Sequence, residues 1–259
     1  MPINIDPVIV DLGFFSLRWY SLLVMAAVVT GVLMARREVL RQGVTVDALL
    51  TLSLWAIPGG IIATRLVHVI DQLSFYLAHP GSIIGGEGQA IYGAILGGTL
   101  AAWVGSKVHG KINFARFMDA AAPGIPLAHS VGRLANVVNG DAAGKPTSVP
   151  WAFTYTHPNT YAPLGVATHP SPVYEILWLL VVFAVIYWLR GRLKPDGTLF
   201  VAYLGLYSFG RFFINFSRVN DPFLFGLHQA QILALVVFLA AGFWLAFKVR
   251  WVKKEPAAS

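Results

Sequence analysis

The sequence predicts an all-α polytopic membrane protein with seven transmembrane helices, and three observations lead to this fold class. Apolar residues make up 56% of the chain and charged residues only 12%, whereas soluble domains carry roughly 25% charged residues. The apolar residues also lie in stretches of roughly 20, the length that crosses a bilayer. The chain has no cysteine, which excludes a disulfide framework, a thiolate metal site and a thiol nucleophile of its own.

Seven apolar stretches are the expected spans. They are residues 17–35, 48–70, 89–107, 117–139, 172–189, 198–216 and 228–247. The fourth stretch is the most polar of the seven, because it includes Pro123, His129, Arg133 and Asn136. A bilayer tolerates such a segment only where protein or a water-filled cavity shields its polar groups. We therefore expect the fourth span to face inward.

Basic residues are concentrated in alternate loops, which predicts the orientation of the chain. The loops after spans one, three, five and seven hold 13 of the 19 lysines and arginines. By the positive-inside rule these loops are cytoplasmic, so the N-terminus lies outside and the C-terminus in the cytoplasm. The excess of positive charge is thus explained by the orientation of the chain in the membrane, and no nucleic-acid partner is expected.

The chain as a whole, residues 1–259, is expected to form a single transmembrane domain. Its longest polar connection, residues 140–171, follows the fourth span and would form a small extracytoplasmic cap on the outer face. In the third span, Gly93, Gly97 and Gly98 lie beside Ala94 and Ala101. Small residues at this spacing predict close helix packing.

Six basic residues fall outside the cytoplasmic loops. They are Arg18, Arg65, Arg133, Lys145, Arg211 and Arg218. An arginine at bilayer depth costs at least about 2.5–3.5 kcal/mol, so these residues need a compensating partner. Arg18 and Arg218 could extend to the outer interface, and Arg65 could pair with Asp71 or Glu87.

Arg133 and Arg211 lie deep in spans four and six, with no carboxylate within one turn. We therefore expect their partner to be an external anion. A guanidinium binds phosphate through paired N–H donors, and the commonest anion in a membrane is a phospholipid headgroup.

The spacing of the neighbouring polar residues indicates two polar helix faces. On span six, Tyr207, Arg211, Asn215 and Arg218 follow one helical stripe. On span four, Arg133, Asn136 and Asn139 repeat every three residues and lead into Gly140 and Asp141. Together the two faces would enclose a cavity near the outer leaflet.

Four motifs extend over nearly the whole chain in a fixed order. They are RWY (18–20), GRLANVVNGDAAG (132–144), HPSPVYE (169–175) and YSFGRFFINFSR (207–218). In sequence and order they resemble the motifs of the prolipoprotein diacylglyceryl transferase family. The resemblance implies an enzyme of the bacterial cytoplasmic membrane that needs no metal and no cofactor. It would transfer the diacylglyceryl group of phosphatidylglycerol to the lipobox cysteine thiol in a preprolipoprotein signal peptide, releasing glycerol phosphate.

The resemblance also implies which residues act. Arg133 and Arg211 match the essential arginines, and we assign them the catalytic role. The residues that we expect to contact substrate, from the family pattern and from the polar faces, are Tyr20, Arg65, Tyr92, Asn136, Asn139, Asp141, Gly144, His169, Tyr207 and Arg218.

Two positions depart from the family pattern. The family often has His-Gly-Gly in the third span, with that histidine proposed as the base, and here the run is Tyr92-Gly93-Ala94. Asn215 stands where an acidic residue is expected on span six. The base therefore stays open among Tyr92, Asp141 and His169, unless the arginines alone acidify the thiol.

Two further expectations follow from the residues themselves. His129 is expected to be a hydrogen-bonded structural residue, because a lone histidine on a helix is commonly one. The alternative function is a membrane transporter or binding protein for a phosphorylated or anionic solute, which would also use buried arginines. Such a transporter would usually show a sequence repeat between its halves, and we find none.

Overall fold

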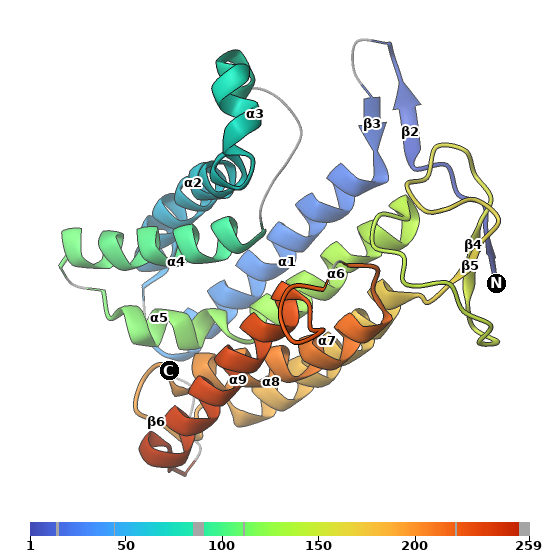
Figure 1. The fold of residues 1–259 in the computed structure, drawn as a ribbon. Helices are drawn as coiled ribbons and strands as arrows, with labels where there is room; N and C mark the ends of the chain where they lie inside the picture. Colours follow the sequence, from blue (N-terminus) through green and yellow to red (C-terminus); the bar gives the residue numbers. More distant parts are fainter. Residues whose placement is uncertain (14–15, 44, 85–90, 111, 221, 254–259) are drawn as a thin grey trace. The chain divides into compact units, whose positions relative to one another are not determined.

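The computed structural model describes residues 1–13, 16–43, 45–84, 91–110, 112–220 and 222–253 (Figure 1). The described part is mostly helical and divides into two compact units. Among the described residues, one unit comprises Met1–Glu38 and residues 118–253, and the other comprises Val39–Phe117. The helices are α1 (Trp19–Arg41), α2 (Val46–Asp71), α3 (Leu73–Ala78), α4 (Ile91–Val108), α5 (Phe114–Ala121), α6 (Gly124–Asn139), α7 (Ser171–Leu189), α8 (Thr198–Ile214) and α9 (Gln229–Lys248), with 3-10 turns η1 (Pro80–Ile84) and η2 (Asn215–Ser217). The strands are β1 (Pro2–Ile3), β2 (Val8–Asp11), β3 (Ser16–Arg18), β4 (Phe153–Tyr155), β5 (Ala167–Thr168), β6 (Leu193–Lys194) and β7 (Arg250–Trp251).

Five helical segments among the described residues are long and apolar enough to cross a membrane. They are α1, α2, α7, α8 extended through η2, and α9. The prediction of a helical membrane protein is therefore confirmed. The two remaining expected spans coincide with α4 and with the α5 and α6 pair, and the count of seven spans stays a prediction.

The fourth expected span is two helices rather than one. Helix α5 ends at Ala121 and α6 begins at Gly124, with Pro123 at the junction. Pro126 lies in the first turn of α6, where the missing N–H of proline removes no helical hydrogen bond. Gly124 approaches the main chain of α1 at Gly31, and a Cβ at Gly124 would lie 3.0 Å from the Gly31 oxygen. The apolar stretch is therefore interrupted where two backbones meet.

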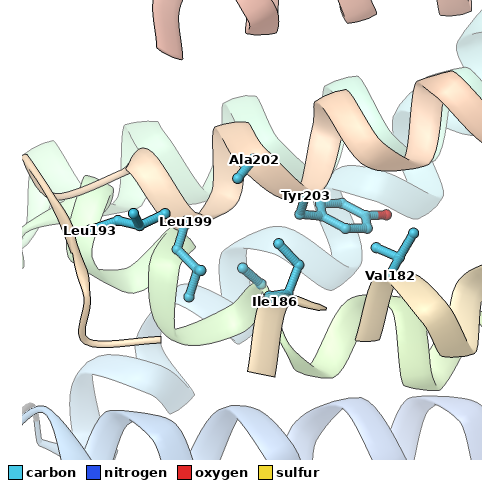
Figure 2. Close-up of a cluster of buried hydrophobic side chains, with 7 residues drawn as sticks. Val182, Ile186, Leu193, Leu199, Ala202 and Tyr203 are labelled. Carbon is cyan, nitrogen blue, oxygen red and sulfur yellow. The ribbon is translucent and has the colours of Figure 1, made fainter. Parts of the chain in front are cut away.

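In the unit that begins at Met1, α6 packs against α7, α7 against α8, and α8 against α9. Buried side chains of α7 and α8 interlock near one end of these helices (Figure 2). Val182 and Ile186 of α7 lie against Leu199 and Tyr203 of α8. This contact fixes the relative position of the helices whose opposite ends carry Glu175 and Arg211.

A short sheet connects the N-terminal residues to the connection between α6 and α7. Strand β1 pairs in parallel with β4, and β4 pairs antiparallel with β5. Further bridges join Pro146 to Thr168 and Gly144 to Arg218. The sheet therefore reaches from the N-terminus to the end of α8, next to Arg218.

In the second unit, α2 and α4 pack closely through small residues, as the glycine pattern predicted. A Cβ at Gly93 would lie 2.5 Å from the Ala63 oxygen, and one at Gly97 would collide with the Ala63 side chain. Glycine at these two positions is therefore required for the close approach of the helices.

The buried Asp119 side chain caps the start of α8. Its Oδ2 accepts a hydrogen bond from the Gly197 N–H at 2.7 Å, and its Oδ1 accepts one from the Phe200 N–H at 2.9 Å. These are N–H groups near the helix start that no helical carbonyl can satisfy. Asp119 thus connects α5 to α8.

We expect Asp119→Ala to lower the free energy of unfolding by about 1–2 kcal/mol, the typical cost of losing a helix cap. Thermal unfolding of the purified protein in detergent measures the effect. Asp47→Ala is the matched control, because it removes an exposed carboxylate from the first turn of α2. Equal stability of the two variants would contradict the capping role.

Candidate active site

Four basic side chains from three segments converge on the carboxylate of Glu175. Arg133 Nη2 of α6 lies 3.0 Å from Glu175 Oε1, and Arg211 Nη1 of α8 lies 3.1 Å from Oε2. Arg218 Nη1, directly after η2, lies 3.7 Å from Oε2. His129 Nε2, one turn before Arg133, lies 3.7 Å from Oε1. The Glu175 side chain is only 1% exposed.

The expectation that Arg133 and Arg211 have no protein carboxylate was wrong. Both bind Glu175, which is 42 positions from Arg133 and 36 from Arg211 along the chain. A search within one helical turn could not find it, because helix packing brings the partner close. The cluster nevertheless keeps an excess of positive charge, since three guanidiniums share one carboxylate.

Two buried donors of the cluster have no acceptor among the described residues. They are Arg133 Nε and Arg218 Nη1. A buried donor without a hydrogen bond costs about 1–3 kcal/mol, and more when it is charged. The excess charge and the open donors together fit an additional anion, and phosphate oxygens match guanidinium geometry.

A chain of hydrogen bonds holds Arg133 from the other side. Arg133 Nη1 donates to Asn136 Oδ1 at 2.9 Å, and Asn136 Nδ2 lies 2.9 Å from both oxygens of Asp141. The helix ends at Gly140, whose φ of 76° turns the chain back toward Asn136. The predicted grouping of Arg133, Asn136 and Asp141 is therefore present.

Gly144 is a point of close backbone approach. Its N–H donates to the His169 carbonyl at 2.9 Å, and the next N–H, of Lys145, donates to the Ser217 carbonyl at 2.7 Å. A Cβ at Gly144 would collide with the Ser217 oxygen and with the Ser171 and His169 side chains. Gly144 thus places the chain beside Arg218.

His169 is held by a hydrogen-bonded series of side chains. Trp151 Nε1 donates to the Tyr174 hydroxyl at 2.7 Å, and that hydroxyl lies 3.1 Å from His169 Nδ1. An indole N–H only donates, so the Tyr174 oxygen accepts from Trp151 and has its own proton available for Nδ1. When Tyr174 donates to Nδ1, neutral His169 carries its proton on Nε2, and Nε2 is then a donor.

The other predicted substrate contacts in this unit lie around the same cluster. The Tyr207 ring stacks on Tyr203, with centroids 6.0 Å apart. Tyr20 is 41% exposed in the first turn of α1, within electrostatic reach of Asp141 and Arg133. Asn139 is buried, and its main-chain oxygen accepts from the Tyr161 N–H.

Arg65 belongs to the second unit, where it binds the backbone of η1. Its Nε donates to the Ile83 oxygen at 2.8 Å, its Nη2 donates to the Ser82 oxygen, and it lies over the Tyr76 ring. The expected partners of Arg65, Glu87 and the Asp71 side chain, lie outside the described residues, as does the Tyr92 side chain.

Asn215, at the position expected to be acidic, is fully buried, and its side chain binds residues outside the cluster. Its Nδ2 lies 3.0 Å from His228 Nδ1, and its Oδ1 accepts from Asn220 at 3.4 Å. His228 begins α9, so this contact joins the ends of α8 and α9.

Two residues of the cluster were not predicted to be site residues. Glu175 is the last residue of the HPSPVYE motif, and the feature that could have identified it is a carboxylate within an otherwise apolar span. His129 was expected to be structural, and the structure places it beside Glu175 and against the Tyr207 ring, with centroids 5.4 Å apart.

Outside the apolar segments, burial and the negative charge of Asp141 raise the pKa of Tyr155 to about 12. Its hydroxyl therefore stays protonated at neutral pH and donates to the Val137 oxygen at 2.9 Å. This bond attaches β4 to the last turn of α6, close to Asn136.

The helices and this cluster define a helical membrane protein with a buried cluster of cationic side chains. The model of the family described as prolipoprotein diacylglyceryl transferase matches residues 7–247. The chain therefore belongs to the prolipoprotein diacylglyceryl transferase family, a family of transferases, and the resemblance drawn from the motifs is confirmed.

Bacterial relatives match over nearly the full length of the chain, and each of three carries the name phosphatidylglycerol-prolipoprotein diacylglyceryl transferase. The relative from Dehalococcoides mccartyi is 37% identical over 253 residues, 97% of each chain. The relative from Trichormus variabilis is 38% identical over 266 residues, 96% of this chain and 91% of its own. The relative from Clostridioides difficile is 34% identical over 233 residues, 89% of this chain and 90% of its own.

We expect Glu175→Gln to destabilise the protein by about 3–5 kcal/mol, because it leaves buried guanidiniums without their carboxylate. Thermal unfolding in detergent measures the loss, and Asp6→Asn is the control, since Asp6 is exposed and contacts only one cationic side chain among the described residues, His157 at 3.7 Å. If added phosphate restores the melting temperature of Glu175→Gln, an anion can replace the carboxylate. An unchanged melting temperature would contradict the importance of Glu175.

Proposed function

We propose that this protein transfers the diacylglyceryl group of phosphatidylglycerol to the lipobox cysteine thiol in the signal peptide of a preprolipoprotein. Membership of the family and the names of the relatives support this function. The observation that carries it is the arginine cluster, in which three guanidiniums share Glu175 and two buried donors find no acceptor in the part of the chain that the structure describes. A phospholipid phosphate supplies the acceptor that the cluster needs.

The reaction is a substitution at a saturated carbon. The cysteine sulfur forms a bond to the glycerol carbon of the lipid, the bond from that carbon to the phosphate oxygen breaks, and glycerol phosphate leaves. The thiol proton must be removed and the negative charge on the leaving phosphate must be stabilised. Fixed guanidiniums in a site of low dielectric provide that stabilisation without reorganising.

We assign phosphate binding in the transition state to Arg133 and Arg211, the catalytic residues of this proposal. Glu175 holds the two guanidiniums in place through one oxygen each, at 3.0 and 3.1 Å. Arg218 adds charge at 3.7 Å from the same carboxylate. Because one carboxylate serves several cations, the site orients its arginines and still attracts an anion.

The other residues that were predicted to contact substrate are assigned to substrate binding in this proposal. Around the cluster they are Tyr20, Asn136, Asn139, Asp141, Gly144, His169 and Tyr207, and in the second unit they are Arg65 and Tyr92. Gly144 acts through the backbone that it brings close to Arg218. His169 is proposed as a donor to the peptide or lipid through Nε2, given its contact with Tyr174.

We further propose that the protein lies in the bacterial cytoplasmic membrane as a single domain with seven spans and an outer N-terminus. Residues 140–171 then form an extracytoplasmic cap, on the side where lipoprotein precursors emerge. The location of 13 of the 19 basic residues in alternate loops supports this orientation.

A transporter or binding protein for an anionic solute is the alternative, because such proteins also bury arginines. The family to which the chain belongs favours the transferase. Liposomes that contain the purified protein distinguish the two functions by anion flux.

We expect Arg133→Ala and Arg211→Ala each to lower the transfer rate by at least about 10²–10³, the usual cost of removing one donor from an oxyanion site. Purified protein is incubated with a lipobox peptide and phosphatidylglycerol, and the thioether product is measured by mass spectrometry. Arg192→Ala is the control, because Arg192 lies over Trp188 at the far end of α7. Full activity of Arg133→Ala would overturn the proposed function.

The absence of cysteine from the chain allows a direct test of orientation. We expect Ser148→Cys to react with a membrane-impermeant maleimide in intact cells, and Lys253→Cys to react only after permeabilisation. Both positions are exposed. The reverse pattern of labelling would contradict the proposed orientation.

A further inference from the structure

His129 is the ionisable member of the cluster to which the proposed function assigns no role. It lies on α6 one turn before Arg133, with Nε2 at 3.7 Å from Glu175 Oε1. Its ring is tilted against Tyr207, with centroids 5.4 Å apart. The His129 side chain is 27% exposed, whereas that of Glu175 is 1% exposed. The ring thus contacts a fully buried carboxylate and is itself partly exposed.

The contact with Glu175 favours one tautomer of the His129 ring. At 3.7 Å it is longer than a hydrogen bond, but the negative charge of the carboxylate favours a proton on the ring nitrogen that faces it, Nε2. The other nitrogen, Nδ1, then has a free lone pair, and no hydrogen bond within the described part of the chain uses it. His169 differs in this respect, because Tyr174 occupies its Nδ1.

The surroundings of His129 act on its protonated form in opposite directions. Burial disfavours the imidazolium, Glu175 on α7 favours it, and Arg133 on α6 and Arg211 on α8 disfavour it. Tyr207 on α8 covers one face of the ring and positions it. A base in such surroundings takes a proton during the reaction and releases it afterwards, as general base catalysis requires.

We propose that His129 is the general base that accepts the proton of the lipobox thiol, an inference that rests on the proposed function. The S–H proton moves to His129 Nδ1 as the sulfur forms its bond to the glycerol carbon and the carbon–oxygen bond breaks. The imidazolium then passes this proton to the leaving glycerol phosphate, which restores neutral His129. Glu175, through Nε2, orients the ring and stabilises its charged form.

The earlier candidates for the base are Tyr92, whose side chain lies outside the described residues, Asp141 and His169. Both carboxylate oxygens of Asp141 accept from the Asn136 amide, so Asp141 positions Asn136, which in turn binds Arg133. The Nδ1 atom of His169 lies against the Tyr174 hydroxyl. Among the described candidates, His129 combines a carboxylate partner with a position one turn from Arg133.

The decisive experiment compares a cysteine lipobox peptide with a selenocysteine lipobox peptide. A selenol is more acidic than a thiol and is largely ionised at neutral pH, so it does not need a base. We expect His129→Gln to lower kcat with the cysteine peptide by about 10²–10³, within the range of general base catalysis. With the selenocysteine peptide, the rates of His129→Gln and the unaltered protein should agree within about threefold. The residual rate of His129→Gln with the cysteine peptide should rise with pH as the free thiol, with a pKa of about 8.5, ionises.

His109→Gln is the matched control, because His109 accepts from Trp55 at the end of α4 and glutamine can also accept there. A normal rate of His129→Gln with the cysteine peptide would overturn the proposal. An equal loss with both peptides would also overturn it, since a structural role predicts that result. If the unaltered protein forms no thioether with either peptide, the proposed function itself fails, and this inference fails with it.

Discussion

The central physical constraint of this protein is the burial of a single carboxylate among three guanidiniums. Glu175 is 1% exposed and contacts Arg133, Arg211 and Arg218. An ionised carboxylate in such a place is stable only when it is paired and hydrogen-bonded. In turn, the arginines can stay charged inside an apolar bundle because they share this carboxylate. The positions of α6, α7 and α8 are therefore coupled to each other through one ionic cluster.

The surrounding structure serves to hold these groups at fixed positions. Apolar packing between Val182, Ile186, Leu199 and Tyr203 sets α7 against α8 (Figure 2). The sheet that includes β4 and β5 reaches Arg218 through the bridge from Gly144. Electrostatic stabilisation depends on such fixed groups, because groups that must reorganise lose much of their effect.

Much of the helical part could be predicted from the sequence, because apolar stretches and basic loops report the physics of the bilayer directly. The close packing at Gly93 and Gly97 was also predictable, because small residues at helical spacing allow two membrane helices to approach each other closely. The break between α5 and α6 was not predicted, because hydropathy does not record where the backbone of α1 approaches.

The candidate site was only partly predictable, for a similar reason. Local spacing correctly grouped Arg133, Asn136 and Asp141. It could not pair Arg133 with Glu175, because their contact depends on how two helices pack. The reason why Gly144 must be glycine could not be predicted either, because it depends on the close approach of the Ser217 oxygen, which lies far along the chain. Motifs identify which residues matter, and packing decides what each one touches.

The 42 positions between Arg133 and Glu175 have a consequence for biosynthesis. In the proposed seven-span arrangement, α6 leaves the ribosome before α7, so its arginine reaches the membrane before its counter-ion exists. Alone in lipid, that arginine costs at least about 2.5–3.5 kcal/mol. The two helices are therefore expected to leave the insertion machinery as a pair, with the early helix held back until the later one is made.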